Sequence, residues 1–219
     1  MKKIFLFLAL VACLQVYAQD TNTWKNYSFG NYCSLSIPNS LELRDPSSES
    51  GRYLDKNVHQ LTLKFGGDAA YKSIVFQPQG MNSSDPKVVH TAMSAYARVI
   101  VELIPSGGIT QSDIDNASAA EITELNSMFY QSYYSDAQTI NRQAVSQFKW
   151  TPLKRAKYSG KNALVLHFKR PGLEGTVDVT EYRFFMRGQQ LRIVFSYRDS
   201  ERSRWAADFA KIISTLKFK

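Results

Sequence analysis

The chain has 219 residues, of which 44% are hydrophobic and 21% charged, and its formal net charge is +8. Its 13 Phe, 12 Tyr and 3 Trp supply enough apolar surface to offset the entropy of ordering, which excludes an intrinsically disordered protein. No repeat and no Pro-rich or Gly/Ser-rich tract occurs, so solenoid and fibrous classes are excluded as well. We expect residues 19–219 to form one domain around a single core.

Residues 1–18 have the pattern of a secretory signal peptide. Two lysines precede eleven apolar residues from Ile4 to Leu14, and Val16 and Ala18 provide small residues before a cleavage site. This apolar run is shorter than the roughly 20 residues that a membrane-spanning helix needs, so we expect cleavage after Ala18 and an exported chain, periplasmic or secreted. The alternative is a lipid anchor at Cys13, because the residues before it resemble a bacterial lipobox. Cleavage after Ala18 leaves Cys33 as the only thiol, which alternation places on a buried strand face.

The first half of the chain mixes strands and helices. Alternating residues predict a first strand over 26–37, which residues 41–44 could continue, and further strands over Val58–Phe65 and Ser73–Gln77. Asp85 as N-cap, Pro86 after it and apolar residues at helical spacing predict a helix from 85 to 103. Residues 107–115 have the composition of a loop, and a second helix is predicted over about 117–140.

The last 70 residues change to period two. They predict four consecutive antiparallel strands, over Leu153–Tyr158, Ala163–Arg170, Thr176–Arg187 and Leu191–Arg198. Asp199 is then expected to cap a final helix whose buried stripe is Trp205, Phe209, Ile212 and Leu216. The fold class is therefore α+β, with an antiparallel meander sheet packed against helices.

The opening segment Tyr32-Cys33-Ser34-Leu35-Ser36-Ile37-Pro38 and the closing meander, with Leu191-Arg192-Ile193-Val194-Phe195-Ser196-Tyr197 before the last helix, resemble the PsbP-like superfamily. That group includes Mog-type Ran-binding proteins and DcrB-type periplasmic proteins. The resemblance implies a PsbP-like sandwich and, by analogy, a non-enzymatic binding or assembly factor. It assigns no site residues, because no functional motif of the family is matched.

Residues that could carry chemistry are scattered. His59, His90 and His167 show no paired metal-ligand spacing, and no nucleophile elbow, phosphate loop or dinucleotide fingerprint occurs. We therefore expect no metal, cofactor or catalytic residue. Asp113, Asp115, Glu121 and Glu124 have the spacing of a calcium loop, but Ala117 and Ser118 break its pattern, so acidic residues near a helix N-terminus are the favoured interpretation. Phe129 and Tyr133 are expected to pack inward, while Tyr130 and Tyr134 either pack under another element or form a sugar-binding or partner surface.

The charge is distributed asymmetrically. Residues 19–148 carry nine Lys/Arg and thirteen Asp/Glu, whereas residues 149–219 carry sixteen and six. With Gly188-Gln189 as a two-residue hairpin turn, Arg187 pairs with Gln190, Phe185 with Arg192 and Arg183 with Val194. The apolar side chains of both strands then share one face, and the opposite face gathers Arg183, Arg187, Arg192 and Arg198, with Glu181 as its acid.

Such a face could bind a phosphate, a carboxylate, a lipid headgroup or an acidic glycan, or it could be covered and neutralised by another element. The predicted function is a non-catalytic binding or assembly module of the bacterial cell envelope, which contacts an anionic component or protein partner through the four arginines. The alternative is an exported hydrolase assembled from distant residues, with His167 as a candidate. Membrane-surface association is a third option, and no nucleic-acid partner is expected.

Overall fold

The computed structural model describes residues 23–48, 72–140, 142–172 and 174–219. The strands are β1 Trp24–Phe29, β2 Cys33–Pro38, β3 Leu41–Leu43, β4 Lys72–Pro78, β5 Ala97–Pro105, β6 Lys149–Tyr158, β7 Lys161–Gly172, β8 Gly175–Met186, β9 Gln189–Arg198 and β10 Lys217–Phe218. The helices are α3 Pro86–Ser94, α4 Gln111–Asn116, α5 Ala119–Ile140 and α6 Arg202–Ser214, with 3-10 turns over Arg142–Gln147 and Asp199–Glu201.

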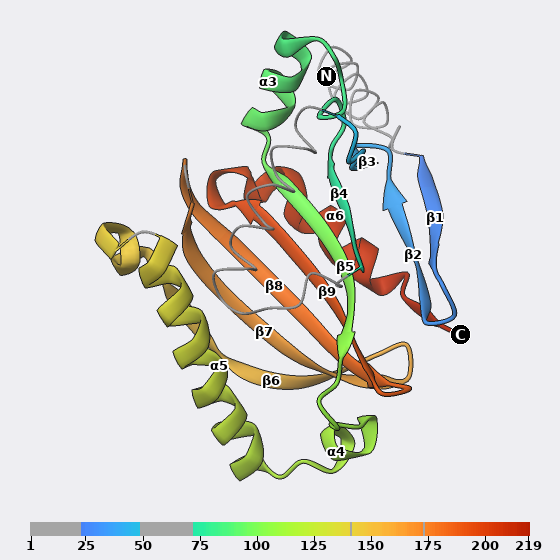
Figure 1. Ribbon diagram of the computed structural model, residues 1–219, viewed down its shortest axis with the longest axis vertical. Coiled ribbons are helices and arrows are strands. Elements are labelled where there is room, and N and C mark those ends of the chain that lie inside the picture. Colours follow the sequence, from blue (N-terminus) through green and yellow to red (C-terminus); the bar gives the residue numbers. More distant parts are fainter. Residues whose placement is uncertain (1–22, 49–71, 141, 173) are drawn as a thin grey trace, which may run out of the picture.

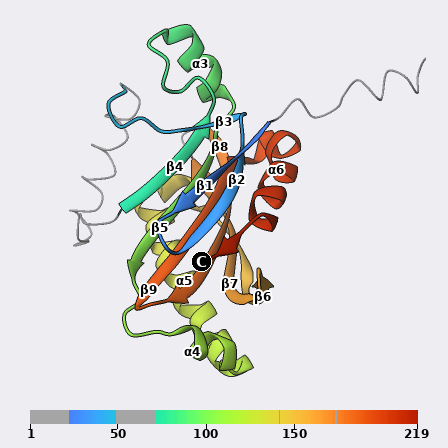
Figure 2. The same ribbon diagram turned by 90° about the vertical axis from the view of Figure 1, so that its right-hand side faces the viewer.

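The strands form two antiparallel sheets. The larger has seven strands in the order β3-β4-β5-β9-β8-β7-β6, and the smaller has three in the order β1-β2-β10. Figure 1 shows α6 behind the large sheet and α5 along its β6–β7 side, and Figure 2 shows β1 and β2 in front, beside α6. The predicted α+β class and the meander β6-β7-β8-β9 are thus confirmed.

The main core lies between the large sheet, the small sheet and α6. Trp205, Phe209, Ile212 and Leu216 are all buried there, as their helical spacing predicts. Cys33 is also fully buried in this core, which confirms its interpretation as a small apolar side chain. Asp199 does not cap α6, since it lies in a 3-10 turn and its carboxylate pairs with Lys169 instead, at 2.7 Å.

A second apolar layer lies on the other face of the large sheet, under α4 and α5. Ile122, Leu125, Phe129 and Tyr133 of α5 pack against buried residues of the sheet such as Leu164 and Phe185. This confirms the predicted helix over 117–140 and the inward orientation of Phe129 and Tyr133. α5 therefore covers the sheet face on which the arginines of β8 and β9 were predicted.

The predicted helix over 85–103 is wrong in its second half. Asp85 does cap α3, with its carboxylate accepting from the Lys87 amide at 2.9 Å, but α3 ends at Ser94 and β5 follows. Residues 97–101 alternate between buried and half-buried, and they pair with β4 on one side and β9 on the other. The apolar residues of this stretch fit both a helical and a strand period. The strand forms because it pairs on both sides and because β-branched residues such as Val99 and Val101 favour strands.

Two other boundaries also differ. The single strand predicted over 26–37 is a hairpin, because Gly30 adopts a φ of +53° and reverses the chain between β1 and β2. The stretch 107–115, predicted as loop, contains α4, which begins at a capping box between Thr110 and Asp113. The predicted strand over 73–77 is confirmed as β4. The signal peptide, Cys13, the strand over 58–65 and His59 lie outside the described residues.

The β8–β9 hairpin has the predicted faces but a different register. Its turn is Arg187-Gly188, with φ of +54° and +71°, as a type I′ turn requires. Arg183 therefore lies opposite Arg192, and Phe185 opposite Gln190. The predicted pairing was displaced by two residues. Such a shift keeps every side chain on its face, so hydrophobic alternation does not detect it.

Candidate functional site: a buried ion network and an exposed basic edge

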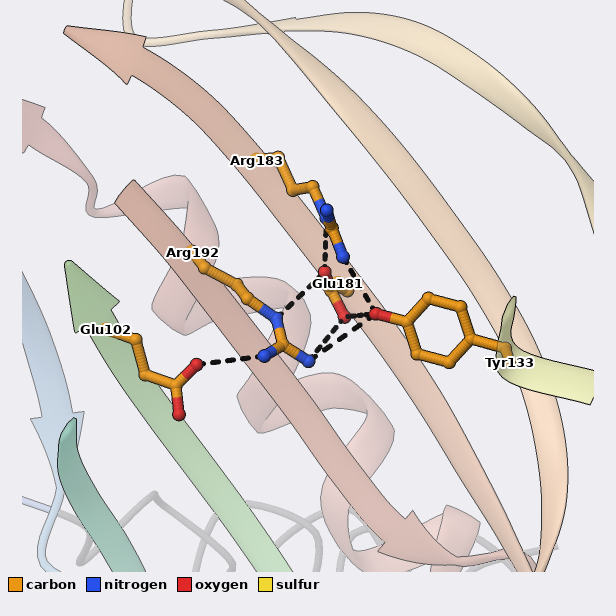
Figure 3. Close-up of polar contacts among 5 residues, drawn as sticks. All are labelled: Glu102, Tyr133, Glu181, Arg183 and Arg192. Atoms are coloured by element: carbon orange, nitrogen blue, oxygen red, sulfur yellow. Dashed lines mark hydrogen bonds and ion pairs between the residues drawn. The ribbon is translucent and has the colours of Figure 1, made fainter. Parts of the chain in front are cut away.

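A buried carboxylate organises the arginines of β8 and β9. Glu181 is 0% exposed, and its Oε1 lies 2.5 Å from Arg183 Nε and 2.9 Å from Arg192 Nε. Arg192 Nη2 also donates to Glu181 Oε2 at 3.0 Å. Figure 3 shows both guanidinium groups converging on this one side chain. The carboxylate thus lies between two like charges that would otherwise repel each other across the strands.

Helix α5 and strand β5 complete the network. The Tyr133 hydroxyl donates to Glu181 Oε2 at 2.7 Å and accepts from Arg183 Nη2 at 2.8 Å. Arg192 Nη1 donates to Glu102 Oε2 at 3.0 Å, directly across from it on β5 (Figure 3). The sequence analysis did not identify Tyr133 or Glu102 as partners, since no local pattern links residues on α5 or β5 to β9.

The electrostatics of the network favour charged arginines, a charged carboxylate and a neutral tyrosine. Burial alone would raise the pKa of the Glu181 carboxyl, but the charges of Arg192 and Arg183 outweigh it, so that the pKa is lowered. Burial, reinforced by the charge of Glu181, raises the pKa of Tyr133 to about 12. The Tyr133 hydroxyl therefore keeps its proton and continues to donate to the carboxylate.

The other two predicted arginines lie elsewhere. Arg187 is exposed in the hairpin turn, where its guanidinium donates to the Asn31 carbonyl at 3.1 Å. Arg198, at the far end of β9, donates to the Ser94 carbonyl at 2.9 Å and pairs with Glu174 at 2.5 Å. The structure brings together Arg183 and Arg192 alone among the four. Their role in binding an anion stays a prediction.

His167 meets both a carboxylate and a hydroxyl. Its Nε2 lies 3.0 Å from Asp178 Oδ1, and its Nδ1 lies 2.9 Å from the Thr151 hydroxyl. The Asp178 side chain is 3% exposed and that of His167 37%. An ionised Asp178 can only accept, which places the ring proton on Nε2 and leaves Nδ1 to accept from Thr151. Arg202 Nη1 also approaches Asp178 Oδ2, at 3.8 Å.

Three of the four acidic residues with calcium-loop spacing accept hydrogen bonds near the ends of α4 and α5. Asp113 accepts from the Thr110 amide at 2.7 Å, and Glu121 from the Ser118 amide at 2.7 Å, while Asp115 pairs with Asn162. Among the residues that the structure describes, no group of three or more His, Cys, Asp or Glu could hold a metal ion.

The two outward tyrosines of α5 form an aromatic stack. Tyr130 and Tyr134 stack with ring centres 5.6 Å apart, and both contact Phe148. The Trp150 indole of β6 lies against Tyr130 and donates to Asn126 Oδ1 at 2.9 Å. These contacts fit the packing alternative for Tyr130 and Tyr134, but Tyr130 is 39% exposed, so the alternative of a sugar-binding or partner surface stays a prediction.

The exposed positive charge gathers on the edge strand β6. Lys149, Lys154 and Lys157 are exposed there, and no ion pair links them to any other described residue. We call these three residues the basic edge. Residues 149–173 contain seven Lys/Arg and no Asp/Glu, so a finer count of charge along the sequence would have indicated this strand. Arg155 of the same strand is engaged, since its Nη1 donates to carbonyls at the end of α4.

The chain is similar in structure to the cyanobacterial PsbP protein, CyanoP, of Synechocystis sp. PCC 6803. The match covers 92% of this chain and 96% of that one at 13% identity, with a TM-score of 0.50. The chain has a PsbP-like fold. Another solved structure that the chain resembles is LpqN of Mycobacterium tuberculosis, described as involved in cell envelope biogenesis, with 12% identity over 93% of this chain and 95% of that one and a TM-score of 0.41.

No protein-family model matches the chain, and no curated protein does either. At these identities the similarity shows the fold alone. Within the part of the chain that the structure describes, no helix is long and apolar enough to cross a membrane.

Proposed function

We propose that the protein is an exported, non-catalytic binding module that contacts an anionic component of the cell envelope through the basic edge. The observation that carries the proposal is the exposure of Lys149, Lys154 and Lys157 on one strand without an ion-pair partner among the described residues. Export rests on the signal-peptide pattern of residues 1–18.

Lysines on an edge strand also keep other sheets from pairing with it. Strands β6 and β7 themselves contribute only cations, because no Asp or Glu occurs in the sequence between Lys149 and Glu174. A surface of one sign raises the local concentration of oppositely charged polymers and accelerates their association. The three lysines are spread along the length of β6, so an extended acidic polymer can contact more of them than a small ion can.

The test is a titration of the protein with polygalacturonate, with neutral dextran as the uncharged comparison, at low and high salt. We expect polygalacturonate to bind at low salt and to dissociate at about 0.5 M salt, where exposed charges are screened. Lys154→Gln/Lys157→Gln should weaken binding several-fold, whereas Lys25→Gln/Lys217→Gln, with the same charge change on exposed positions of the small sheet, should not. Absence of binding at low salt, or equal loss in both variants, would refute the proposal.

The same titration tests the four arginines predicted as a binding face. Arg187 is the exposed member, so Arg187→Gln changes that face without removing a partner of Glu181. Weaker polygalacturonate binding by Arg187→Gln would extend the proposed surface to the β8–β9 turn. Unchanged binding would restrict it to β6.

A second candidate function is favoured by the contacts of His167. An ester hydrolase would use Thr151 as nucleophile: its oxygen bonds to the acyl carbon while its proton passes to His167 Nδ1, and Asp178 stabilises the imidazolium at Nε2. The alcohol leaves with that proton, and water then releases the acid. If the wild type hydrolyses p-nitrophenyl acetate and both Thr151→Val and His167→Gln lose this activity, the candidate is supported. If the wild type hydrolyses the ester no faster than the two variants do, it is excluded.

A further inference from the structure

A pocket lies between α3, the end of β4 and the start of α6. Its volume is about 380 Å³, and it is separate from the basic edge, the buried network and His167. One side is apolar, formed by Pro78, Val88 and Ala92. This side of the pocket is therefore suited to contact with a hydrocarbon chain, whereas the remaining lining residues are mostly polar.

The polar lining is cationic. Lys87 and Arg204 both line the pocket, and no Asp or Glu is among its described lining residues. Both side chains are exposed, and no ion pair joins either to another described residue. The Arg204 guanidinium lies over the Trp205 ring, 5.0 Å from its centre, which limits its freedom. Lys87 is in the first turn of α3, where the helix dipole disfavours a cation. An anion in the pocket would offset that cost.

The walls of the pocket are held by contacts between elements distant in sequence. Arg198 donates to the carbonyl of Ser94, a lining residue, and so joins the end of β9 to the end of α3. α3 also packs closely on the turn after β4: Gly80 has a φ of +102°, and a Cβ there would lie 3.0 Å from Val88 Cγ1. The pocket is therefore a preformed feature of the fold.

We propose that this pocket binds an amphipathic anion, with a phosphate or carboxylate head group between Lys87 and Arg204 and an alkyl chain along Val88 and Pro78. The hydroxyls of Thr91 and Ser94 donate to carbonyls of α3, at 2.9 Å to Lys87 O and 2.7 Å to Thr91 O, so the two cations are the donors for the head group. The alkyl chain is inferred from the apolar wall, since Val88 lines the pocket and is still 43% exposed. The proposal concerns a small ligand and a surface other than the basic edge.

Calorimetric titration of the protein with octyl phosphate, inorganic phosphate and octyl glucoside separates the head group from the tail. We expect octyl phosphate to bind at least about 10-fold more tightly than inorganic phosphate, and octyl glucoside to show no binding up to about 10 mM. Lys87→Gln/Arg204→Gln should weaken octyl phosphate binding about 10-fold or more, and Val88→Asp should weaken it while leaving inorganic phosphate binding in place. Thermal unfolding of each variant checks that it remains folded.

The matched control is Lys154→Gln/Lys157→Gln, which removes two cations from the basic edge and should leave octyl phosphate binding unchanged. This control also keeps the pocket and the basic edge distinguishable. Competition by phosphatidylglycerol vesicles, but not phosphatidylcholine vesicles, would identify the head group as one presented by a bilayer, and lack of competition would identify a monomeric amphiphile. Both results support an amphipathic anion in the pocket and differ only in its source. The proposal would be overturned if octyl glucoside bound as tightly as octyl phosphate, or if Lys87→Gln/Arg204→Gln bound octyl phosphate with unchanged affinity.

Discussion

Arg183 lies directly opposite Arg192 across β8 and β9, and both guanidinium groups contact the one fully buried carboxylate of Glu181. Arginines side by side in neighbouring strands repel each other, so the arrangement depends on the acid between them. The network also joins β5 through Glu102 and α5 through Tyr133. It is therefore a structural contact between the sheet and its covering helix.

Removal of the central charge should be strongly destabilising. Glu181→Gln leaves two arginines without their shared counter-ion beneath α5, and we expect a loss of about 3 kcal/mol in the free energy of unfolding. Urea denaturation followed by circular dichroism measures it. Glu174→Gln is the control, because its side chain is 70% exposed and its pair with Arg198 should contribute no more than about 0.5 kcal/mol. A loss equal to that of the control would contradict the structural role of the network.

The same carboxylate predicts a pH dependence. Because the folded pKa of Glu181 is lowered, the stability it contributes is fully present above the unfolded value, about 4.3, and is lost as the pH falls through the lower folded pKa. We expect the difference in unfolding free energy between the wild type and Glu181→Gln to shrink from pH 7 towards about pH 3. Urea midpoints at a series of pH values measure this. A difference independent of pH would show that Glu181 is not ionised in the folded protein.

The Tyr133 hydroxyl should contribute separately from its ring. Tyr133→Phe keeps the ring contact with Phe168, at 4.7 Å between centres, but removes the donor to Glu181. We expect a cost of about 1–2 kcal/mol. A double-mutant cycle with Glu181→Gln measures their coupling, which should be about 1 kcal/mol if the hydroxyl acts through the carboxylate. If the two losses in unfolding free energy are purely additive, the Tyr133 hydroxyl does not stabilise the protein through Glu181.

The Cys33 thiol should be inert in the folded protein. Burial raises its pKa from 9.0 to about 12, which lowers the thiolate fraction near pH 8 by about 1,000-fold. Ellman's reagent should therefore react with residues 19–219 only after unfolding in urea. A Cys33→Ala chain with Asn31→Cys in the exposed β1–β2 turn provides a thiol that should react without urea. Rapid reaction of native Cys33 would show that the core between β2 and α6 opens readily.

Sequence alone predicted most of the second half of the fold, because alternation determines which face each strand residue occupies. It placed Arg183 and Arg192 on the face opposite Phe184 and Leu191, as the structure does. It missed the register by two residues, since a shift of two preserves every face. It considered coverage of this face by another element but did not identify α5 as the cover, because Tyr133 is 48 residues from Glu181 and no local pattern joins them.

The errors in the first half have a different origin. Residues 97–105 fit a helical period and a strand period about equally, and only their pairing with β4 and β9 decides between the two.

The location of the exposed positive charge was also predicted incompletely. The sequence analysis assigned it to β8 and β9, where four arginines were predicted to share a face. The distinction between paired and unpaired cations depends on acids brought in from β5 and from loops, as Glu102 and Glu174 show.

The pairing of β10 with β2 has a consequence for folding kinetics. The Ser36 amide of β2 donates to the Thr215 hydroxyl, 179 residues later, at 2.9 Å, and Figure 1 shows the C-terminus beside the β1–β2 hairpin. A ribosome delivers β2 long before residues 215–218 exist, so the apolar face of β2 with Leu35 and Ile37 stays without α6 and β10 for most of synthesis. Contacts of such long range slow folding and prolong the exposure of apolar surface. The apolar face of β2 is therefore one of the surfaces that the chain can bury only after its last helix has been made.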